Sequence, residues 1–367
     1  MRAKAIIHLD HYRENIKSIK ARVGNDKLIC LPVKADAYGH GAVQTANTCL
    51  EAGVHCFGVA DITEAVELIN GGVKAPILLF SQPALDAIPH IVELGIIPFI
   101  SDKDFASILN EHARIKKAKL PVHIKIDTGM GRIGCHAEES LKLARFVESS
   151  SGLELAGIAT HFAVSDSVNA QDKEYTKMQI NRFKVAVDAI KSAGINPGIV
   201  HAANSGAIIQ HPDAYFDMVR PGILLYGYNI VDGVEQLQVK PVMELKSNVV
   251  LIKKIRKDES VSYGRTWIAR EDTNIAILPV GYGDGLPRLA SGKWQVVIKE
   301  KTYPIAGLIC MDQCCVDIGV HSNVQRWDEA VIFGGSAPDA AALAAKVGTI
   351  PYEITCNINK RVQREYV

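Results

Sequence analysis

The chain has 367 residues, of which 48% are hydrophobic and 22% are charged, and its formal net charge is +1. This length is sufficient for two domains with separate cores, and the near-neutral charge lacks the basic surface that binds nucleic acid or anionic membranes. No apolar run approaches the roughly 20 residues that span a bilayer, and charged residues interrupt segment 1–15 before it forms a signal-peptide core. We therefore expect a cytoplasmic protein without a nucleic-acid or membrane partner.

The N-terminal half has a regular alternation of strands and helices. A short apolar strand at 3–9 precedes this pattern and has no obvious partner in it. Eight further strands are expected at 28–34, 56–60, 77–80, 96–100, 122–127, 154–162, 198–204 and 218–223, and the clearest helices at 62–70, 104–117, 139–149 and 172–194. This alternation predicts an α/β fold, a parallel (β/α)8 barrel of the TIM type. A doubly wound open sheet is the alternative, which the lack of GxGxxG after the first strand disfavours.

The pattern changes after about residue 235. Segments rich in Val, Ile and Thr alternate with Gly, Asp and Pro turns, and they predict strands at 245–256, 274–280, 294–300 and 316–320. Only 338–348 has a helical pattern. The sequence therefore predicts a barrel domain at 10–235, a mainly-β domain at 236–367 and a linker near 231–240.

The eight cysteines are interpreted as reduced thiols. Cys30 and Cys56 lie in apolar strand-like runs, where free cysteine behaves as a small hydrophobic residue. Cys310, Cys314 and Cys315 have neither a CxxC pair nor a histidine at the spacing of a zinc site. The sequence therefore predicts neither disulfides nor a metal site.

Lys34 ends the first predicted barrel strand, and a polar, glycine-containing turn with Tyr38 follows it. In barrels of this type, functional side chains gather at the C-terminal ends of the strands. A buried lysine loses its charge easily and can then act as a nucleophile that forms a Schiff base. A salt-bridged structural lysine is the alternative.

Polar groups also end several other strands of the predicted barrel. They are Lys125 and Asp127, with Arg132 in the following TGMGRIG, then His161, then His201, Asn204 and Ser205, and finally Arg220. Cations and imidazoles that converge with few carboxylates favour an anionic ligand. Each group taken alone could instead be a satisfied structural polar group.

Two segments near the last strands suggest that this anion is a phosphate. Residues 204–206 open a helical pattern, so that backbone N–H groups and the Ser205 hydroxyl point outward at a helix N-terminus. Residues 221–223 offer a second backbone cradle, and phosphate sites after strands seven and eight are frequent in such barrels. An ordinary N-cap and a loop glycine are the alternative.

A series of motifs extends over the whole chain: VKADAYGHG, KIDTGMGRIG, THFA, HAANSGA, VRPGILLYG, VSYGRTW, PVGYGDG, ICMDQ and YEI with INKRV. This series resembles the bacterial alanine racemase family, whose enzymes use pyridoxal phosphate. The resemblance implies a barrel, a β domain that the N-terminal strand 1–9 joins, and a head-to-tail homodimer with an active site shared between subunits. It also implies interconversion of L-alanine and D-alanine, which supplies D-alanine for peptidoglycan.

The resemblance further implies residue roles. Lys34 would carry the cofactor as a Schiff base and act as one catalytic base, and Tyr263 would be the second base. The cofactor ligands would be Tyr38, His161, Asn204, Ser205, Arg220, Gly222, Ile223 and Tyr352, with Arg220 facing the pyridine nitrogen. The substrate site would include Arg132 and, from the partner subunit, Met311, Asp312 and Tyr282. Lys125 corresponds to a lysine that is often carbamylated in the family and then orients Arg132.

Some alternatives remain. His161 either links Arg220 to Tyr263 or is a structural histidine at a strand end. A broader-specificity or serine racemase is the nearest alternative activity. A decarboxylase of basic amino acids would need a different set of C-terminal motifs, and a single-domain pyridoxal-phosphate carrier would lack the second domain. Gln363 stands where many relatives have a proline, and this departure is peripheral. Asp36 stands where asparagine is also common, and nothing follows from it.

Overall fold

A computed structural model describes residues 2–231 and 233–367. Met1 of the predicted N-terminal strand and Asp232 of the predicted linker lie outside the described residues. The chain divides into two compact units, and both are discontinuous in sequence. One contains residues 12–35 and 42–239, and the other contains residues up to 11, 36–41 and 240–367. Residues 36–41 therefore group with the C-terminal part of the chain.

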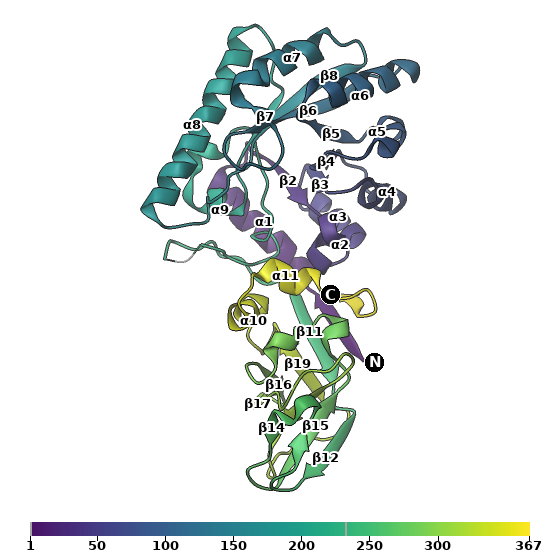
Figure 1. The fold of residues 1–367 in the computed structure, drawn as a ribbon, viewed down its shortest axis with the longest axis vertical. Coiled ribbons are helices and arrows are strands. Elements are labelled where there is room, and N and C mark those ends of the chain that lie inside the picture. The colour runs from purple at the N-terminus through teal and green to yellow at the C-terminus, as the bar shows by residue number, and fades with distance from the viewer. Residues whose placement is uncertain (1, 232) are drawn as a thin grey trace. The chain divides into compact units, whose positions relative to one another are not determined.

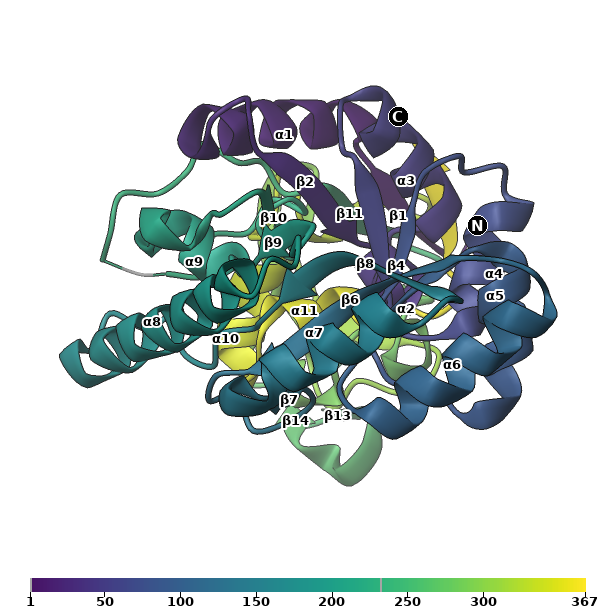
Figure 2. The same ribbon diagram turned by 90° about the horizontal axis from the view of Figure 1, so that it is seen from above.

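The first unit is a closed barrel of eight parallel strands (Figure 2). The strands are β2 (Leu28–Pro32), β3 (Cys56–Val59), β4 (Ile77–Leu79), β5 (Ile97–Ile100), β6 (Leu120–Asp127), β8 (Leu153–Ala159), β9 (Ile199–His201) and β10 (Met218–Val219). Strand β10 pairs with β2 and closes the ring. The predicted (β/α)8 barrel is confirmed, and the open-sheet alternative is wrong. Strand β7 (Cys135–His136) pairs with β6 in addition.

Helices connect the strands along the outside of the barrel (Figures 1 and 2). They are α1 (Leu9–Val23), α3 (Ala42–Glu51), α4 (Ile62–Asn70), α5 (Ile88–Leu94), α6 (Lys103–Ile115), α7 (Ser140–Ser149), α8 (Ala170–Ser192) and α9 (Ser205–Gln210). Asp61, Asp102 and Asn169 fix where α4, α6 and α8 begin, because each side chain accepts a hydrogen bond from a backbone N–H of the first turn. Short 3-10 helices occupy Leu85–Ala87, Ala137–Glu139 and Pro212–Ala214.

Segment α2 (Lys34–Gly39) is helical but has the opposite hand. Its residues Ala35, Asp36, Ala37 and Tyr38 have φ values of 52, 54, 52 and 53°. The left-handed conformation costs an L-residue roughly 1–2 kcal/mol, and normally only single residues adopt it. The chain therefore leaves the first barrel strand through a strained turn.

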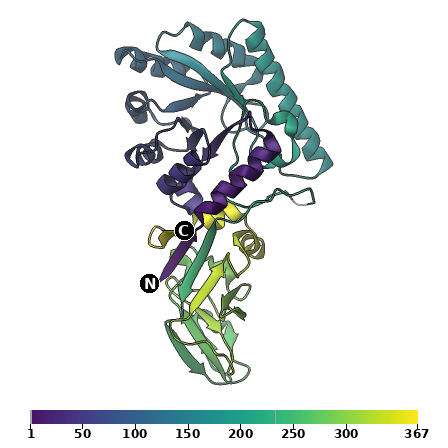
Figure 3. The same cartoon turned by 180° about the vertical axis from the view of Figure 1, so that it is seen from behind.

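The second unit is mainly β (Figures 1 and 3), as predicted. Strand β1 (Ala3–Ile7) lies between β11 (Met243–Asn248), to which it is antiparallel, and β20 (Gln363–Tyr366), to which it is parallel. The same six-stranded sheet contains β16 (Gln295–Ile298), β17 (Lys301–Pro304) and β19 (Glu329–Phe333). Other strands are β12 (Leu251–Ile255), β13 (Ser260–Val261), β14 (Trp267–Ile268), β15 (Thr273–Leu278) and β18 (Cys314–Asp317), and the helices are α10 (Ala340–Val347), α11 (Pro351–Cys356) and 3-10 segments at Tyr263–Arg265, Tyr282–Asp284 and Arg288–Ala290.

The cores account for most of the cysteines. Cys30 and Cys56 face each other on β2 and β3 and pack with Leu78, Phe99 and Met218 in the barrel. No cysteine of the described residues forms a disulfide, and five of the eight thiol-bearing residues are buried. No helix of the described residues is long and apolar enough to cross a membrane.

Candidate active site

Five polar side chains that the sequence singled out converge in the barrel unit. Burial lowers the pKa of His161 well below its usual value, and the charges of Lys125, Arg220, Arg132 and Lys34 lower it further. Electrostatic effects of this kind act over a few ångströms. The ends of strands β2, β6, β8 and β10 thus bring two lysines and two arginines near one neutral imidazole, which creates an electropositive site.

The Arg220 guanidinium is buried, and none of its hydrogen-bond acceptors is a carboxylate. It donates to the backbone carbonyls of Thr160 (2.6 Å) and Ala202 (2.8 Å), and to Nδ1 of His201 (2.6 Å) and of His161 (3.4 Å). Burial lowers its pKa to about 10, so that it remains protonated at neutral pH. The site therefore holds an uncompensated positive charge.

The hydrogen bond to Arg220 fixes the tautomers of two histidines inside the barrel. Because Nδ1 of His201 accepts a proton from Arg220, its Nε2 carries the ring proton and donates to Nδ1 of His123 at 2.8 Å. A Cβ at Gly157 would overlap the His123 ring, so the missing side chain makes room for it. The sequence interpretation missed His123, although its alternation with Lys125 and Asp127 on β6 places all three on one face.

Acid should destabilise the fold through His123. Burial lowers its pKa from 6.5 to about 3, so the unfolded chain binds a proton that the folded chain does not. The stability that results is complete above pH 6.5 and is lost as the pH falls toward the folded pKa. By pH 5.5 the loss in the free energy of unfolding is about 1.4 kcal/mol. Urea unfolding at pH 7.5 and at pH 5.5 measures how much of the free energy of unfolding is lost between the two. This loss should be smaller by about 1.4 kcal/mol in His123→Asn than in the wild type. The exposed His136 provides the control: His136→Asn should retain the full loss, and equal losses in both variants would contradict the assignment.

Lys125 is buried beside these groups and faces away from water. Its Nζ lies 5.8 Å from the centre of the Phe99 ring. Burial, followed by the charges of Arg220 and Arg132, lowers the pKa of Lys125 well below its usual value, and Asp127 offsets this only in part. A lysine with a lowered pKa loses its proton more readily, and the resulting amine is a nucleophile.

Asp127 shapes the loop that carries Arg132. Its carboxylate accepts hydrogen bonds from the backbone N–H groups of Gly129 (2.9 Å), Met130 (2.8 Å) and Gly131 (3.0 Å). Burial raises the pKa of Asp127, but these three bonds outweigh burial and lower it. The carboxylate of Asp127 thus organises the loop backbone, and the Arg132 side chain stays exposed.

The segments after β9 and β10 fit an anion. The N–H groups of the buried Gly222 and Ile223 donate to no group of the described residues, and Leu224 N–H donates to the Ser205 hydroxyl at 3.3 Å. Buried N–H groups normally have an acceptor, and a phosphate would provide one. Asn204 instead has a structural contact, because its carboxamide oxygen accepts from Ala207 N–H (3.1 Å) and caps α9.

Tyr38 and Tyr352 form a pair in the second unit. Their ring centroids are 5.4 Å apart, and Tyr38 is 5% exposed. Burial and the neighbouring Tyr352 raise the pKa of Tyr38 well above its usual value. Its hydroxyl therefore stays protonated and can act as a hydrogen-bond donor.

The second unit also presents three large side chains to solvent. Tyr263 is 71% exposed, Met311 54% and Tyr282 43%. Segment 307–312 accepts a hydrogen bond from the turn that carries each tyrosine. Before Tyr263, the Ser262 hydroxyl donates to the Leu308 carbonyl at 2.5 Å, and the Tyr282 N–H donates to the Cys310 carbonyl at 3.1 Å. One segment of the second unit thus holds both the Tyr263 turn and the Tyr282 turn.

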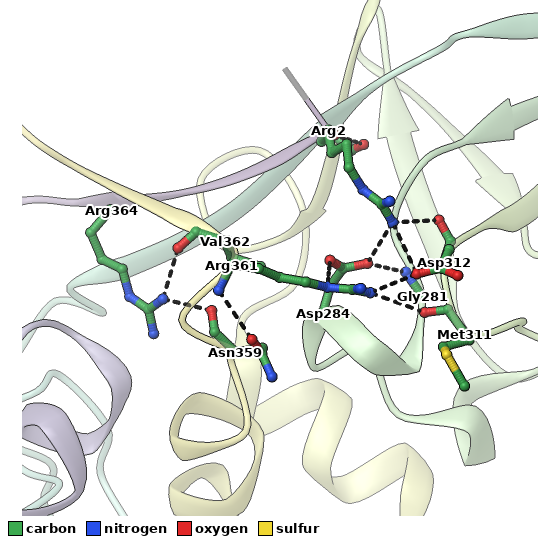
Figure 4. Close-up of polar contacts among 10 residues, drawn as sticks. Arg2, Gly281, Asp284, Met311, Asp312, Asn359, Arg361, Val362 and Arg364 are labelled. Carbon is green, nitrogen blue, oxygen red and sulfur yellow. Dashed lines mark hydrogen bonds and ion pairs between the residues drawn. The ribbon is translucent and has the colours of Figure 1, made fainter.

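A network of charges holds the Tyr282 turn and the Met311 segment together (Figure 4). The buried Asp284 accepts from Arg361 Nε (2.8 Å) and from Gly281 N–H (2.9 Å), and Arg2 lies 3.6 Å away. Arg361 and Arg2 also reach the Asp312 carboxylate, at 3.0 and 3.3 Å. A Cβ at Gly281 would overlap the backbone of the Met311 segment, which explains the glycine before Tyr282.

Asp284→Asn should therefore destabilise the second unit. The change removes a buried charge that accepts charge-assisted hydrogen bonds, and we expect a loss of about 2–3 kcal/mol in the free energy of unfolding. Urea denaturation measures it. Asp312→Asn is the matched control, since this carboxylate is half exposed in the same network and its loss should have little effect. Similar losses of unfolding free energy in both variants would argue against a special stabilising role of the buried Asp284 carboxylate.

Comparison with known proteins places the whole chain in one group. Residues 7–230 match the family model described as alanine racemase, N-terminal domain, and residues 242–366 match alanine racemase, C-terminal domain. A curated alanine racemase from Treponema denticola is 53% identical over 100% of this chain and 99% of its own length. The solved alanine racemase of Clostridium difficile 630 matches with a TM-score of 0.95 at 36% identity, over 100% of this chain and 96% of that one. The structure from Bartonella henselae, described as having covalently bound pyridoxal phosphate, matches with a TM-score of 0.88 at 29% identity over 100% of both chains.

Proposed function

Because the chain belongs to the alanine racemase family, we propose that it interconverts L-alanine and D-alanine with pyridoxal phosphate as cofactor. The observation that carries the proposal is the electropositive site at the strand ends of the barrel, where the basic residues Lys34, Lys125, Arg132 and Arg220 all act on His161. The D-alanine would serve peptidoglycan synthesis. The cytoplasm, whose thiols stay reduced, suits a chain with buried unpaired cysteines such as Cys30 and Cys314.

The described residues fit the cofactor. The unpaired N–H groups of Gly222 and Ile223, together with the Ser205 hydroxyl, would receive the phosphate, as would the hydroxyls of Tyr38 and Tyr352. Arg220 would face the pyridine nitrogen. Because a guanidinium holds its protons firmly, Arg220 would not transfer a proton to that nitrogen. Lys34 would hold the cofactor covalently. Asn204, whose carboxamide oxygen caps the Ser205 helix, would be a further ligand.

Racemisation requires a base on each face of the substrate. Pyridoxal phosphate, when bound, supplies an electron sink that acidifies the α-proton of an amino acid. The Lys34 amine would take or return this proton on one face and the Tyr263 hydroxyl on the other, so that inversion follows from their opposite positions. Arg132 would bind the substrate carboxylate, and Lys125, as a carbamate, would orient Arg132.

We also propose that the active form is a homodimer in which Tyr263, Tyr282, Met311 and Asp312 complete the site of the other subunit. The exposure of Tyr263, Tyr282 and Met311 supports this arrangement. Mixing Lys34→Ala chains with Tyr263→Phe chains tests it, because each mixed dimer would contain one site with both bases. Random exchange should then restore about a quarter of the wild-type activity. A mixture that exchanges subunits and stays inactive would contradict the shared site.

Chiral chromatography of products from L-alanine, L-serine and L-lysine tests the activity itself. We expect D-alanine as the main product, with D-serine as a minor product at most. Rapid formation of D-serine would favour the alternative serine or broader-specificity racemase, and release of CO2 from L-lysine would favour a decarboxylase.

A further inference from the structure

The left-handed segment α2 needs support from its surroundings. It contains four consecutive non-glycine residues with φ near 53°, and only Asp36 is of a type that tolerates this conformation. Backbone in a sparsely populated conformation persists only where neighbouring groups fix it. The contacts that fix α2 should therefore be numerous and specific.

Arg364 of strand β20 supplies some of those contacts. Its Nε and Nη2 donate to the Gly39 carbonyl, at 3.0 and 2.9 Å, which is the last carbonyl of the turn. Its Nη1 donates to the carbonyls of Asn359 and Val362, both at 2.7 Å (Figure 4), and Nη2 also donates to Ile358 at 2.7 Å. One guanidinium thus joins the end of the turn to the segment that follows α11.

The bonding of Arg364 depends on the fork shape of arginine rather than on a salt bridge. The side chain of Arg364 is 10% exposed, and its carboxylate neighbour Asp36 is 3.9 Å away, beyond hydrogen-bond distance. Four backbone carbonyls in fixed directions match the planar donors of arginine, which the single ammonium of lysine cannot reproduce. Burial lowers the pKa of Arg364, and the nearby Asp36 and Tyr366 offset this in part.

Glycines bring the turn close to the same neighbours. A Cβ at Gly39 would overlap the Thr355 carbonyl, and a Cβ at Gly41 would overlap the Tyr366 hydroxyl. Both glycines have positive φ, 84° and 94°. The turn therefore packs closely against α11 and β20.

The two segments that Arg364 joins carry the tyrosine pair. Tyr38 lies in the turn, one residue before Gly39, and Tyr352 lies in α11, which ends just before Ile358. We infer that Arg364 is a positioning residue that holds Tyr38 and Tyr352 at the spacing that a cofactor phosphate requires. This inference rests on the proposed function, since the two tyrosines act there as phosphate ligands.

The affinities for pyridoxal phosphate and for pyridoxal, which lacks the phosphate, test the inference. Full-length Arg364→Gln should bind pyridoxal phosphate about 10- to 100-fold more weakly, the range expected for lost charge-assisted hydrogen bonds, and should bind pyridoxal as the wild type does. Arg364→Lys, a milder change if the glutamine variant folds poorly, should show a smaller loss with the same selectivity. Hydrogen exchange of residues 36–41 should accelerate in both variants.

Arg361→Gln is the matched control, because Arg361 lies three residues earlier and binds Asp284 instead. It should leave both affinities and the exchange of residues 36–41 at their wild-type values. Equal weakening of both ligands in the Arg364 variants would indicate general destabilisation and overturn the inference, as would unchanged binding of pyridoxal phosphate. Failure of the proposed function is distinguishable, since the wild type itself would then bind pyridoxal phosphate no better than pyridoxal.

Discussion

Lys34→Ala should lose covalent attachment of the cofactor and lower the racemisation rate at least about 10³-fold. The change removes both the amine that would hold the cofactor and one of the two bases, and a single positioned base contributes about 10²–10⁴-fold. Borohydride reduction followed by mass spectrometry should show the cofactor mass on wild-type chains and not on the variant. Chiral chromatography of the products from L-alanine measures the rate.

The other barrel lysine provides the control for Lys34. Lys125→Met removes a buried amine of the same site but should retain the covalent adduct, because only Lys34 follows the first barrel strand directly. Added methylamine should partly restore activity to Lys34→Ala, since a small amine can enter the space that the side chain leaves. An adduct on Lys34→Ala chains would show that another lysine carries the cofactor.

Tyr263→Phe should affect the two enantiomers unequally. Without the hydroxyl, exchange of the α-proton with deuterated water should fall about 10²–10⁴-fold for L-alanine, whereas Lys34 should still exchange the α-proton of D-alanine. Proton NMR of each enantiomer in deuterated water measures both rates. The ring is 71% exposed in the single chain, so the loss of the hydroxyl should leave the unfolding transition unchanged.

Tyr282→Phe is the comparison variant for Tyr263→Phe, since it removes a hydroxyl from the same exposed surface without removing a proposed base. It should slow exchange of both enantiomers to the same small extent. Equal slowing of both enantiomers in Tyr263→Phe would contradict a scheme in which each base serves one face.

The barrel could be predicted from the sequence, because each of its strands is marked by a local run of apolar residues. Apolar runs such as 56–60 and 77–80 coincide with β3 and β4, and even the two-residue strand β10 lies within a predicted run. Side chains at strand ends could be placed at one end of the barrel because all strands of a parallel barrel point the same way. His123 was missed because it lies within β6 rather than at its end.

Other features depend on contacts between distant segments. Propensity alone favours an ordinary right-handed helix for Ala35-Asp36-Ala37-Tyr38. The left-handed turn instead makes contacts with distant segments, among them Arg364, more than three hundred residues later. The terminal strand β20 is short and mostly polar, so its periodicity does not reveal that it pairs with β1. The lowered pKa of Lys125 follows from its burial and from the charges of Arg220 and Arg132, which the sequence does not show.

The position of β1 between β11 and β20 also constrains the order of events during synthesis. Strand β1 can pair with both of its neighbours only after residues 243–248 and then 363–366 have been synthesised. Closing such long loops has an entropic cost and is slow relative to the local pairing of successive barrel strands. The barrel strands are therefore translated and can pair while the β sheet still lacks its edge. Since Arg364 belongs to β20, the turn after Lys34 acquires this contact only after residues 363–366 have been translated, and nascent chains that lack them should be unable to bind cofactor tightly.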